Sequence, residues 1–228
     1  MKLHLEWLAS PVGQTLLAQE SALVRATLQQ FFGDHILQIG RWGETSDFLA
    51  GARTRYRAVV DAEPGPGISG VVNPRRLSIA TDSVDAVFLP HTLELSRSPH
   101  AVLREVQRIL RPDGRLVALG FNPISWWGLR HQFVERGYPT GVVRHISRRR
   151  MADWLNLLNL RVDEITPVSM TTASGRPDNL FNWMSWSRPA YMVLATKETI
   201  PMTHVRPRIR RRARLVSSLV NPSTRNVA

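Results

Sequence analysis

The sequence predicts an α/β domain built on a mostly parallel sheet with helices on both faces. Short apolar segments of strand length alternate along the chain with amphipathic segments of helix length, as in proteins with parallel sheets. Turn-forming Gly, Pro and Asp residues separate these segments. The chain has 228 residues, of which 43% are hydrophobic, so it can form one such domain with a full core and terminal extensions.

The first long helix is expected at residues 11–32, with Ser10 as its N-cap and Pro11 as its first helical residue. Gly33 and Asp34 are expected to end it. A second helix is expected at residues 99–110, where apolar positions recur at helical spacing between charged ones. Further helices are expected at residues 45–50, 124–136 and 147–158.

Seven apolar segments have the length and bounds of strands. They are residues 35–39, 56–61, 69–72, 85–89, 115–119, 160–168 and 190–196. Two prolines and two glycines make residues 63–67 a loop, and Pro112-Asp113-Gly114 is expected to turn into the fifth strand. The last two strands have no helical segment between them, which favours antiparallel pairing because a parallel crossover usually carries a helix.

Composition limits the cellular setting and the partners. The chain has no cysteine, which excludes disulfides and thiolate chemistry, and it has no apolar run long enough to span a membrane. The N-terminus lacks the apolar stretch of a secretion signal, so we expect a cytoplasmic protein. The formal net charge is +12, and seven arginines lie after residue 205 with no acidic residue among them. Such a segment is typical of a solvated tail, and it can also contact polyanions non-specifically.

One part of the chain resembles a known family. Asp82-Ser83-Val84-Asp85 precedes the fourth strand, Leu93-Glu94 follows it, and residues 108–114 read Arg-Ile-Leu-Arg-Pro-Asp-Gly before the fifth. These motifs resemble the centre of class I S-adenosylmethionine-dependent methyltransferases of the small type 11 branch. The resemblance covers residues 34–197 and implies a Rossmann-like sheet of seven strands with an antiparallel last strand. It divides the chain into an N-terminal helical segment (1–33), a methyltransferase-like domain (34–197) and a basic tail (198–228).

The resemblance places S-adenosylmethionine at the carboxyl ends of the first strands, which is where open α/β sheets bind ligands. The family has an acidic residue and then Gly-x-Gly-x-Gly after its first strand, since side chains there would block the cofactor. Here Gln38 stands for the acid, Gly40 matches the first glycine, and Gly43 is offset by one from the pattern. Trp42 and Glu44 occupy the other two glycine positions. A plain strand-to-helix turn is the alternative interpretation of this loop.

Two residues after the next strands complete the expected cofactor site. Asp61 ends the second strand, where the family has an acidic residue on the ribose hydroxyls. Asn73 follows the third strand, where its carbonyl would accept from the adenine amino group. Asp61 and Asn73 are also residues that commonly cap turns before prolines.

His91 follows the fourth strand, close to the expected position of the cofactor methyl, so it is a candidate cofactor contact and a weaker candidate base. A surface or hydrogen-bonding role is the alternative. Methyl transfer depends mainly on positioning, and the sequence identifies no catalytic residue. The seven histidines have no metal-ligand spacing, so no metal is expected.

Large apolar side chains follow the fifth and sixth strands. They are Phe121, Trp126, Trp127, Phe181, Trp183, Met184 and Trp186. They favour a small, partly apolar methyl acceptor if they converge at the cofactor side, although they could equally cover the sheet edge.

Three functions therefore compete. The first is methyl transfer from S-adenosylmethionine to a small molecule. The second is a catalytically degenerate relative that acts as a partner-binding module. The third is a nucleic-acid methyltransferase that uses the basic tail, although the slot after the fourth strand, Leu89-Pro90-His91-Thr92, lacks the motif of such enzymes.

Overall fold

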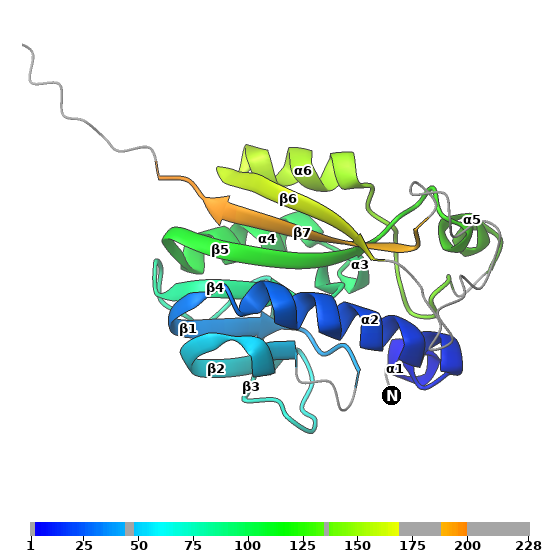
Figure 1. Ribbon diagram of the computed structural model, residues 1–228, viewed down its shortest axis with the longest axis horizontal. Coiled ribbons are helices and arrows are strands. Elements are labelled where there is room, and N and C mark those ends of the chain that lie inside the picture. The colour runs from blue at the N-terminus through cyan, green and yellow to red at the C-terminus, as the bar shows by residue number, and fades with distance from the viewer. Residues whose placement is uncertain (1–2, 44–47, 135–136, 169–187, 200–228) are drawn as a thin grey trace, which may run out of the picture.

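The computed structural model describes residues 3–43, 48–134, 137–168 and 188–199. Its centre is a seven-stranded sheet in the order β3-β2-β1-β4-β5-β7-β6 (Figure 1). The strands are β1 (Phe32–Ile39), β2 (Arg53–Asp61), β3 (Gly70–Val71), β4 (Val84–Leu89), β5 (Leu110–Phe121), β6 (Leu160–Val168) and β7 (Ala190–Lys197). Strands β1 to β5 pair in parallel, and β7 runs antiparallel to both β5 and β6. The predicted fold class and the antiparallel last strand are confirmed.

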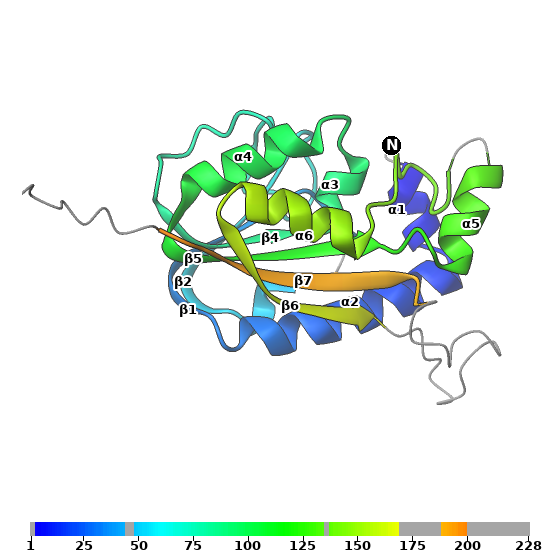
Figure 2. The ribbon, with the colours of Figure 1, turned by 90° about the horizontal axis from the view of Figure 1, so that it is seen from above.

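Helices cover both faces of the sheet, as Figure 2 shows from above. The helical elements are α1 (Leu3–Leu8), α2 (Pro11–Leu28), η1 (Phe48–Gly51), α3 (Thr92–Leu95), α4 (Pro99–Ile109), α5 (Trp126–Phe133) and α6 (Arg148–Leu157). Apolar residues of α4 and α6 form one core with one face of the strands, and those of α1, α2 and η1 form a second core with the other face. Burial of these two apolar layers supplies the main stabilisation of the sheet.

Local sequence signals set most element boundaries. The Ser10 hydroxyl caps α2 by accepting a hydrogen bond of 3.2 Å from the Gly13 amide, as predicted. The same arrangement starts α6, where the Ser147 hydroxyl accepts from the Arg150 amide at 3.2 Å. These caps satisfy amides that have no partner within their own helix.

The structure differs from several of the predicted elements. α2 ends at Leu28 rather than at residue 32, because the chain turns there and Phe32 already pairs with Arg53 in the sheet. Residues 45–47 of the helix predicted at 45–50 lie outside the described residues, and its described part belongs to the 3₁₀ helix Phe48–Gly51. The α1 and α3 helices were not predicted separately. The turn expected at residues 112–114 lies inside β5, as an irregularity between the pairs Val84–Leu110 and Ala86–Arg115.

Candidate functional site

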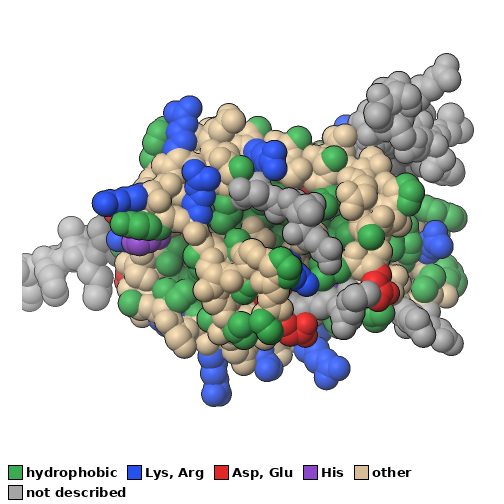
Figure 3. Space-filling model, turned by 90° about the horizontal axis from the view of Figure 1, so that it is seen from below, with side chains coloured by type: hydrophobic (Ala, Val, Ile, Leu, Met, Phe, Trp, Pro, Cys, Tyr) green, Lys and Arg blue, Asp and Glu red, His purple; other side chains and the backbone are tan. Residues whose placement is uncertain are grey.

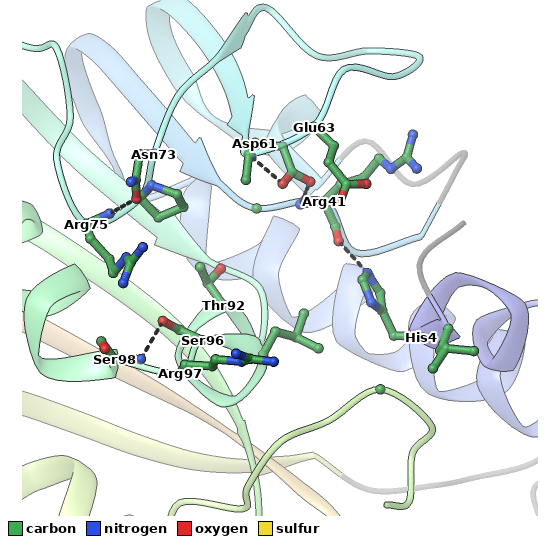
Figure 4. Close-up of a pocket in the computed structure, with 16 residues that line it drawn as sticks. His4, Arg41, Asp61, Glu63, Asn73, Arg75, Thr92, Ser96, Arg97 and Ser98 are labelled. Carbon is green, nitrogen blue, oxygen red and sulfur yellow. Dashed lines mark hydrogen bonds between the residues drawn. The ribbon is translucent and has the colours of Figure 1, made fainter. Parts of the chain in front are cut away.

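A cavity of about 590 Å³ opens at the carboxyl ends of β1 and β2 (Figure 4). It is lined by residues 40–41, 61–63, 73–75, 92 and 95–98, together with 3–4 from α1 and Gly141. β1 lies between β2 and β4, so the chain order reverses at this point of the sheet. Ligands of open α/β sheets bind where the order reverses, and the volume suits a small molecule.

Gly40 forms the floor of the cavity beside β1. Its φ is +93°, and its amide donates a hydrogen bond of 2.7 Å to the Val60 carbonyl. A Cβ at this position would lie 2.7 Å from the Thr92 hydroxyl, which itself donates to the carbonyl of Ile39. Both the backbone angle and the space therefore require glycine here, which fits the predicted close approach of a ligand to the backbone.

Asp61 stands at the end of β2, and its side chain lies at the cavity wall in Figure 4. Its Oδ2 accepts from the Arg41 amide at 3.1 Å and its Oδ1 from the Ala62 amide at 2.6 Å. These bonds fix the carboxylate, which is only 4% exposed, against the turn that follows β1. The predicted place of Asp61 next to Gly40 is thus what the structure shows.

Asn73 also lines the cavity, across from Ser96 and Ser98 in Figure 4. Its Oδ1 accepts a hydrogen bond of 3.0 Å from the Arg75 amide. The turn-capping interpretation of Asn73 is therefore correct. This role is compatible with the predicted hydrogen bond from the adenine amino group, because an amide oxygen can accept two hydrogen bonds.

Gln38 and Gly43 do not line the cavity in the described part of the chain. The buried Gln38 side chain donates a hydrogen bond of 3.0 Å to the Gly40 carbonyl, so it supports the turn from behind. Gly43 is buried with φ of +82°. Of the residues predicted to bind the cofactor, the structure brings together Gly40, Asp61 and Asn73.

Trp42 points into the core and leaves the cavity open. The indole is 1% exposed, and its Nε1 donates a hydrogen bond of 2.8 Å to Oε2 of Glu20 on α2. The His4 ring stacks on it with centroids 5.7 Å apart, and His4 rather than Trp42 faces the cavity. The bulky residue at the position of the second glycine therefore does not fill the space beside Gly40.

His91 lies fully buried behind the cavity, not on its wall. Its Nε2 is 2.8 Å from Oε1 of Glu20, and its Nδ1 is 2.9 Å from Oε2 of Glu94. The ring also stacks on Phe121 at 4.0 Å. Burial alone would lower the pKa of His91, but the two carboxylates outweigh it and raise the pKa to about 9. The structure thus gives His91 a buried ion-pair role.

Glu94 is shared between His91 and the backbone. Its Oε1 accepts from the amides of Phe121 at 2.7 Å and Ile146 at 3.2 Å. Burial raises the pKa of Glu94, while His91 and these amides act in the opposite direction. The network thereby ties α3, the end of β5 and the segment before α6 to α2.

Sequence reasoning missed Glu20, although a signal for it exists. Leu16, Glu20, Val24 and Leu28 follow one another at intervals of four, and all four side chains are buried. A carboxylate on the apolar stripe of a helix needs a buried partner. That spacing could have predicted a buried role for Glu20. It could not have identified His91 as the partner, because His91 lies 71 residues away in the sequence.

The aromatic residues predicted to surround the acceptor do not line the cavity where they are described. Phe121 is buried in the core, Trp127 packs edge-on against Trp7 and Tyr138, and Trp126 is 65% exposed. The other members of that set, at residues 181–186, and the tail arginines lie outside the described residues. Covering the sheet end is therefore the role that the structure gives Phe121 and Trp127.

Neither a metal centre nor a membrane span is found in the part of the chain that the structure describes. No group of three His, Asp or Glu side chains there could hold a metal ion. None of the helices described is both long and apolar enough to cross a bilayer.

The chain is similar to several known proteins. A methyltransferase-domain family model of type 11 matches residues 48–118, beginning just after the turn that contains Gly40 and Gly43. The uncharacterized protein YafS of Escherichia coli K12 is 34% identical over 179 residues, which cover 76% of this chain and 72% of YafS. The ubiquinone/menaquinone biosynthesis C-methyltransferase UbiE of Rubrivivax gelatinosus is 27% identical over 108 residues, 42% of either chain.

A solved structure shares the fold. An S-adenosylmethionine-dependent methyltransferase from Mesorhizobium loti superposes with a TM-score of 0.56 at 19% identity, covering 78% of this chain and 97% of that one. The alignment covers almost the whole of that protein, so the two share the overall fold.

Proposed function

The chain belongs to the class I S-adenosylmethionine-dependent methyltransferase family, in its type 11 branch, and we propose that it transfers a methyl group from S-adenosylmethionine to a small-molecule acceptor. The observation that carries this proposal is the open cavity in which Gly40 and Asp61 stand side by side. The residues present fit the cofactor, since a bare backbone and a carboxylate are the groups that a nucleoside needs there.

Each of three residues has a role in this proposal. Gly40 lets the ligand approach the backbone, because it carries no side chain. The Asp61 carboxylate accepts hydrogen bonds from the ribose hydroxyls, and the two backbone amides that it already binds hold it in place. The Asn73 carbonyl, which the Arg75 amide holds in place, would accept a hydrogen bond from the adenine amino group.

When bound, S-adenosylmethionine supplies a methyl group that its sulfonium already activates. The protein then contributes mainly position, holding donor and acceptor in line. His91 is enclosed by Glu20 and Glu94 behind the cavity and does not line it, so it takes no proton from the acceptor. The described lining contains no Phe, Tyr or Trp side chain, so it does not include the aromatic residues that the sequence suggested for the acceptor.

The test is a calorimetric titration of the purified full chain with S-adenosylmethionine and S-adenosylhomocysteine. We expect micromolar binding, weakened about 10- to 100-fold by Asp61→Ala because a charge-assisted hydrogen bond contributes roughly 1.5–3 kcal/mol. Glu63→Ala is the matched control, since it removes an exposed carboxylate from the same cavity. It should change the affinity by less than about threefold.

A second candidate is a relative without catalysis that binds a partner. The observation in its favour is that Trp42 stands at a glycine position of the family and is anchored in the core. If the folded protein gives no heat of binding in the same titration at millimolar cofactor, the first candidate is excluded and the second remains.

A further inference from the structure

The free edge of the sheet carries a cluster of exposed side chains at the end opposite the cavity. β3 pairs only with Val60 and Asp61, so within the described chain the first half of β2 has no strand on its outer side. Figure 3 views the molecule from this side, and basic side chains gather there around a histidine and a hydrophobic ring. We call the set Phe32, His35, Arg53, Arg55, Tyr56 and Arg57 the strand-edge patch.

The patch is strongly basic. Arg53, Arg55 and Arg57 alternate along β2, and all three are exposed. No carboxylate in the described part of the chain forms an ion pair with any of them. Their charge is therefore available to an anionic partner.

Aromatic rings are interleaved with these arginines. Phe32 is 70% exposed and Tyr56 52% exposed, although both have a large apolar surface. The Arg53 guanidinium lies 5.6 Å from the centre of the Phe32 ring and that of Arg55 5.2 Å from the Tyr56 ring. His35 stacks on the same tyrosine at 5.1 Å and 17°. Because paired residues of neighbouring strands point to the same face, Phe32 lies on the face of the three arginines and His35 and Tyr56 lie on the opposite face, with the Arg55 guanidinium near the tyrosine ring at the strand edge.

Protection of the sheet edge explains only part of this pattern. Charged side chains on an edge strand prevent pairing with another sheet, which accounts for three arginines. It does not account for exposed rings, which would add to the tendency to associate. Exposed rings on both sides of an arginine-rich strand edge match the requirements of single-stranded nucleic acid, whose bases stack on aromatic faces while arginines contact the phosphates.

The patch is far from the cavity. Arg53 and Asp61 mark the two ends of β2, about 26 Å apart at a rise of about 3.3 Å per residue. A ligand on the patch would therefore leave the cavity accessible.

We propose that the strand-edge patch binds single-stranded nucleic acid, with Arg53, Arg55 and Arg57 on the phosphates and Phe32 and Tyr56 under the bases. This binding goes beyond the proposed methyl transfer and does not depend on it. It would place the protein on a nucleic acid without making that nucleic acid the methyl acceptor.

The test measures fluorescence anisotropy of a labelled oligothymidylate of about 20 nucleotides against the full chain over a range of salt concentrations. Replacing Arg53, Arg55 and Arg57 together by Ala should reduce the slope of log affinity against log salt by about 2, since each phosphate contact contributes about 0.7. Replacing the same three by Lys should keep the slope. Tyr56→Ala should weaken binding roughly 5- to 100-fold at an unchanged slope, as expected for loss of a stacking platform.

The matched control replaces Arg104, Arg149 and Arg150 by Ala, which removes the same charge from exposed positions on α4 and α6. We expect at most a twofold change. An equal loss in this control would overturn the proposal in favour of non-specific attraction to a basic protein. So would binding to vesicles of anionic lipid without binding to the oligonucleotide. If the Arg53/Arg55/Arg57 alanine variant self-associates and keeps its affinity for the oligonucleotide, the arginines only protect the sheet edge from pairing, and the proposal is overturned. Circular dichroism of each variant checks its fold.

Discussion

The indole of Trp42 donates a hydrogen bond of 2.8 Å to Glu20, a carboxylate buried in the middle of α2. The other oxygen of the same carboxylate lies 2.8 Å from His91, so the Glu20 side chain contacts both Trp42 in the turn after β1 and His91 in the loop after β4. This contact directs the indole into the core and away from Gly40. It explains how a tryptophan can stand at a glycine position of the family while the cavity stays open.

We expect Trp42→Phe to lower the free energy of unfolding by about 1–3 kcal/mol, because it leaves a buried carboxylate oxygen of Glu20 without its donor. The measurement is urea denaturation followed by circular dichroism. Trp126→Phe is the control, since Trp126 is 65% exposed and should change stability by less than about 0.5 kcal/mol. Equal stabilities for the two variants would contradict a structural role for the Trp42–Glu20 bond.

The sequence predicted the strands that border the site better than the directions of the side chains around it. Asp61 could be placed because a parallel strand must end at the edge where the β1 turn lies, whatever the side chains around it. The direction of Trp42 could not, because a side chain in a turn can face the ligand or the core, and here Glu20 decides. That contact joins residues 22 positions apart through tertiary packing, which periodicity alone does not reveal.

His4 illustrates the same limit. It reaches the cavity from α1, and its Nε2 lies 3.3 Å from the Arg41 carbonyl, yet nothing around residue 4 in the sequence marks it as a cavity residue. His91 was placed correctly after β4 and given the wrong surroundings, since its two carboxylate partners come from α2 and α3.

Gly40→Ala should destabilise the protein by about 2–4 kcal/mol. The positive φ of +93° costs about 1–2 kcal/mol for any residue with a Cβ, and that Cβ would press on the Thr92 hydroxyl, a donor to the Ile39 carbonyl. Gly67→Ala is the matched control, because its φ is +73° but nothing lies within 4 Å of the added Cβ. It should cost only the backbone strain.

Adding Thr92→Ala to Gly40→Ala should restore part of the loss, since it removes the atoms that the new Cβ meets. Thermal unfolding of the two single variants and the double variant measures this. Strictly additive effects would show that Thr92 is not the obstacle.

His91 should make the protein less stable as the pH rises from about 6.5 to 9. Its pKa is about 9 in the folded state, above its ordinary value of 6.5, so the folded protein binds the extra proton in this range and the unfolded chain does not. The stabilisation is complete below pH 6.5 and is lost as the pH passes 9.

Urea midpoints measured between pH 6.5 and 9.5 test this expectation. The wild type should show the decline, and His91→Gln should be less stable at pH 6.5 with a flatter profile. A wild-type profile that rises over this interval would show that the imidazole is neutral between its two carboxylates.

The acid side of the profile should depend on His145. Burial, followed by the charges of His131 and His91, lowers the pKa of His145 to about 4. Its Nε2 bonds to the Tyr138 carbonyl at 2.9 Å, while its Nδ1 is buried without a partner, so the ring is held neutral.

Because the unfolded chain protonates this histidine near pH 6.5 and the folded protein only near 4, stability should fall as the pH drops through that interval. His145→Phe should flatten the acid limb, while His100→Gln, an exposed histidine on α4, should leave it unchanged. With His91 acting on the alkaline side, the wild type should be most stable near pH 6.5. An acid limb that is equally steep in His145→Phe would assign the loss of stability to the carboxylates instead.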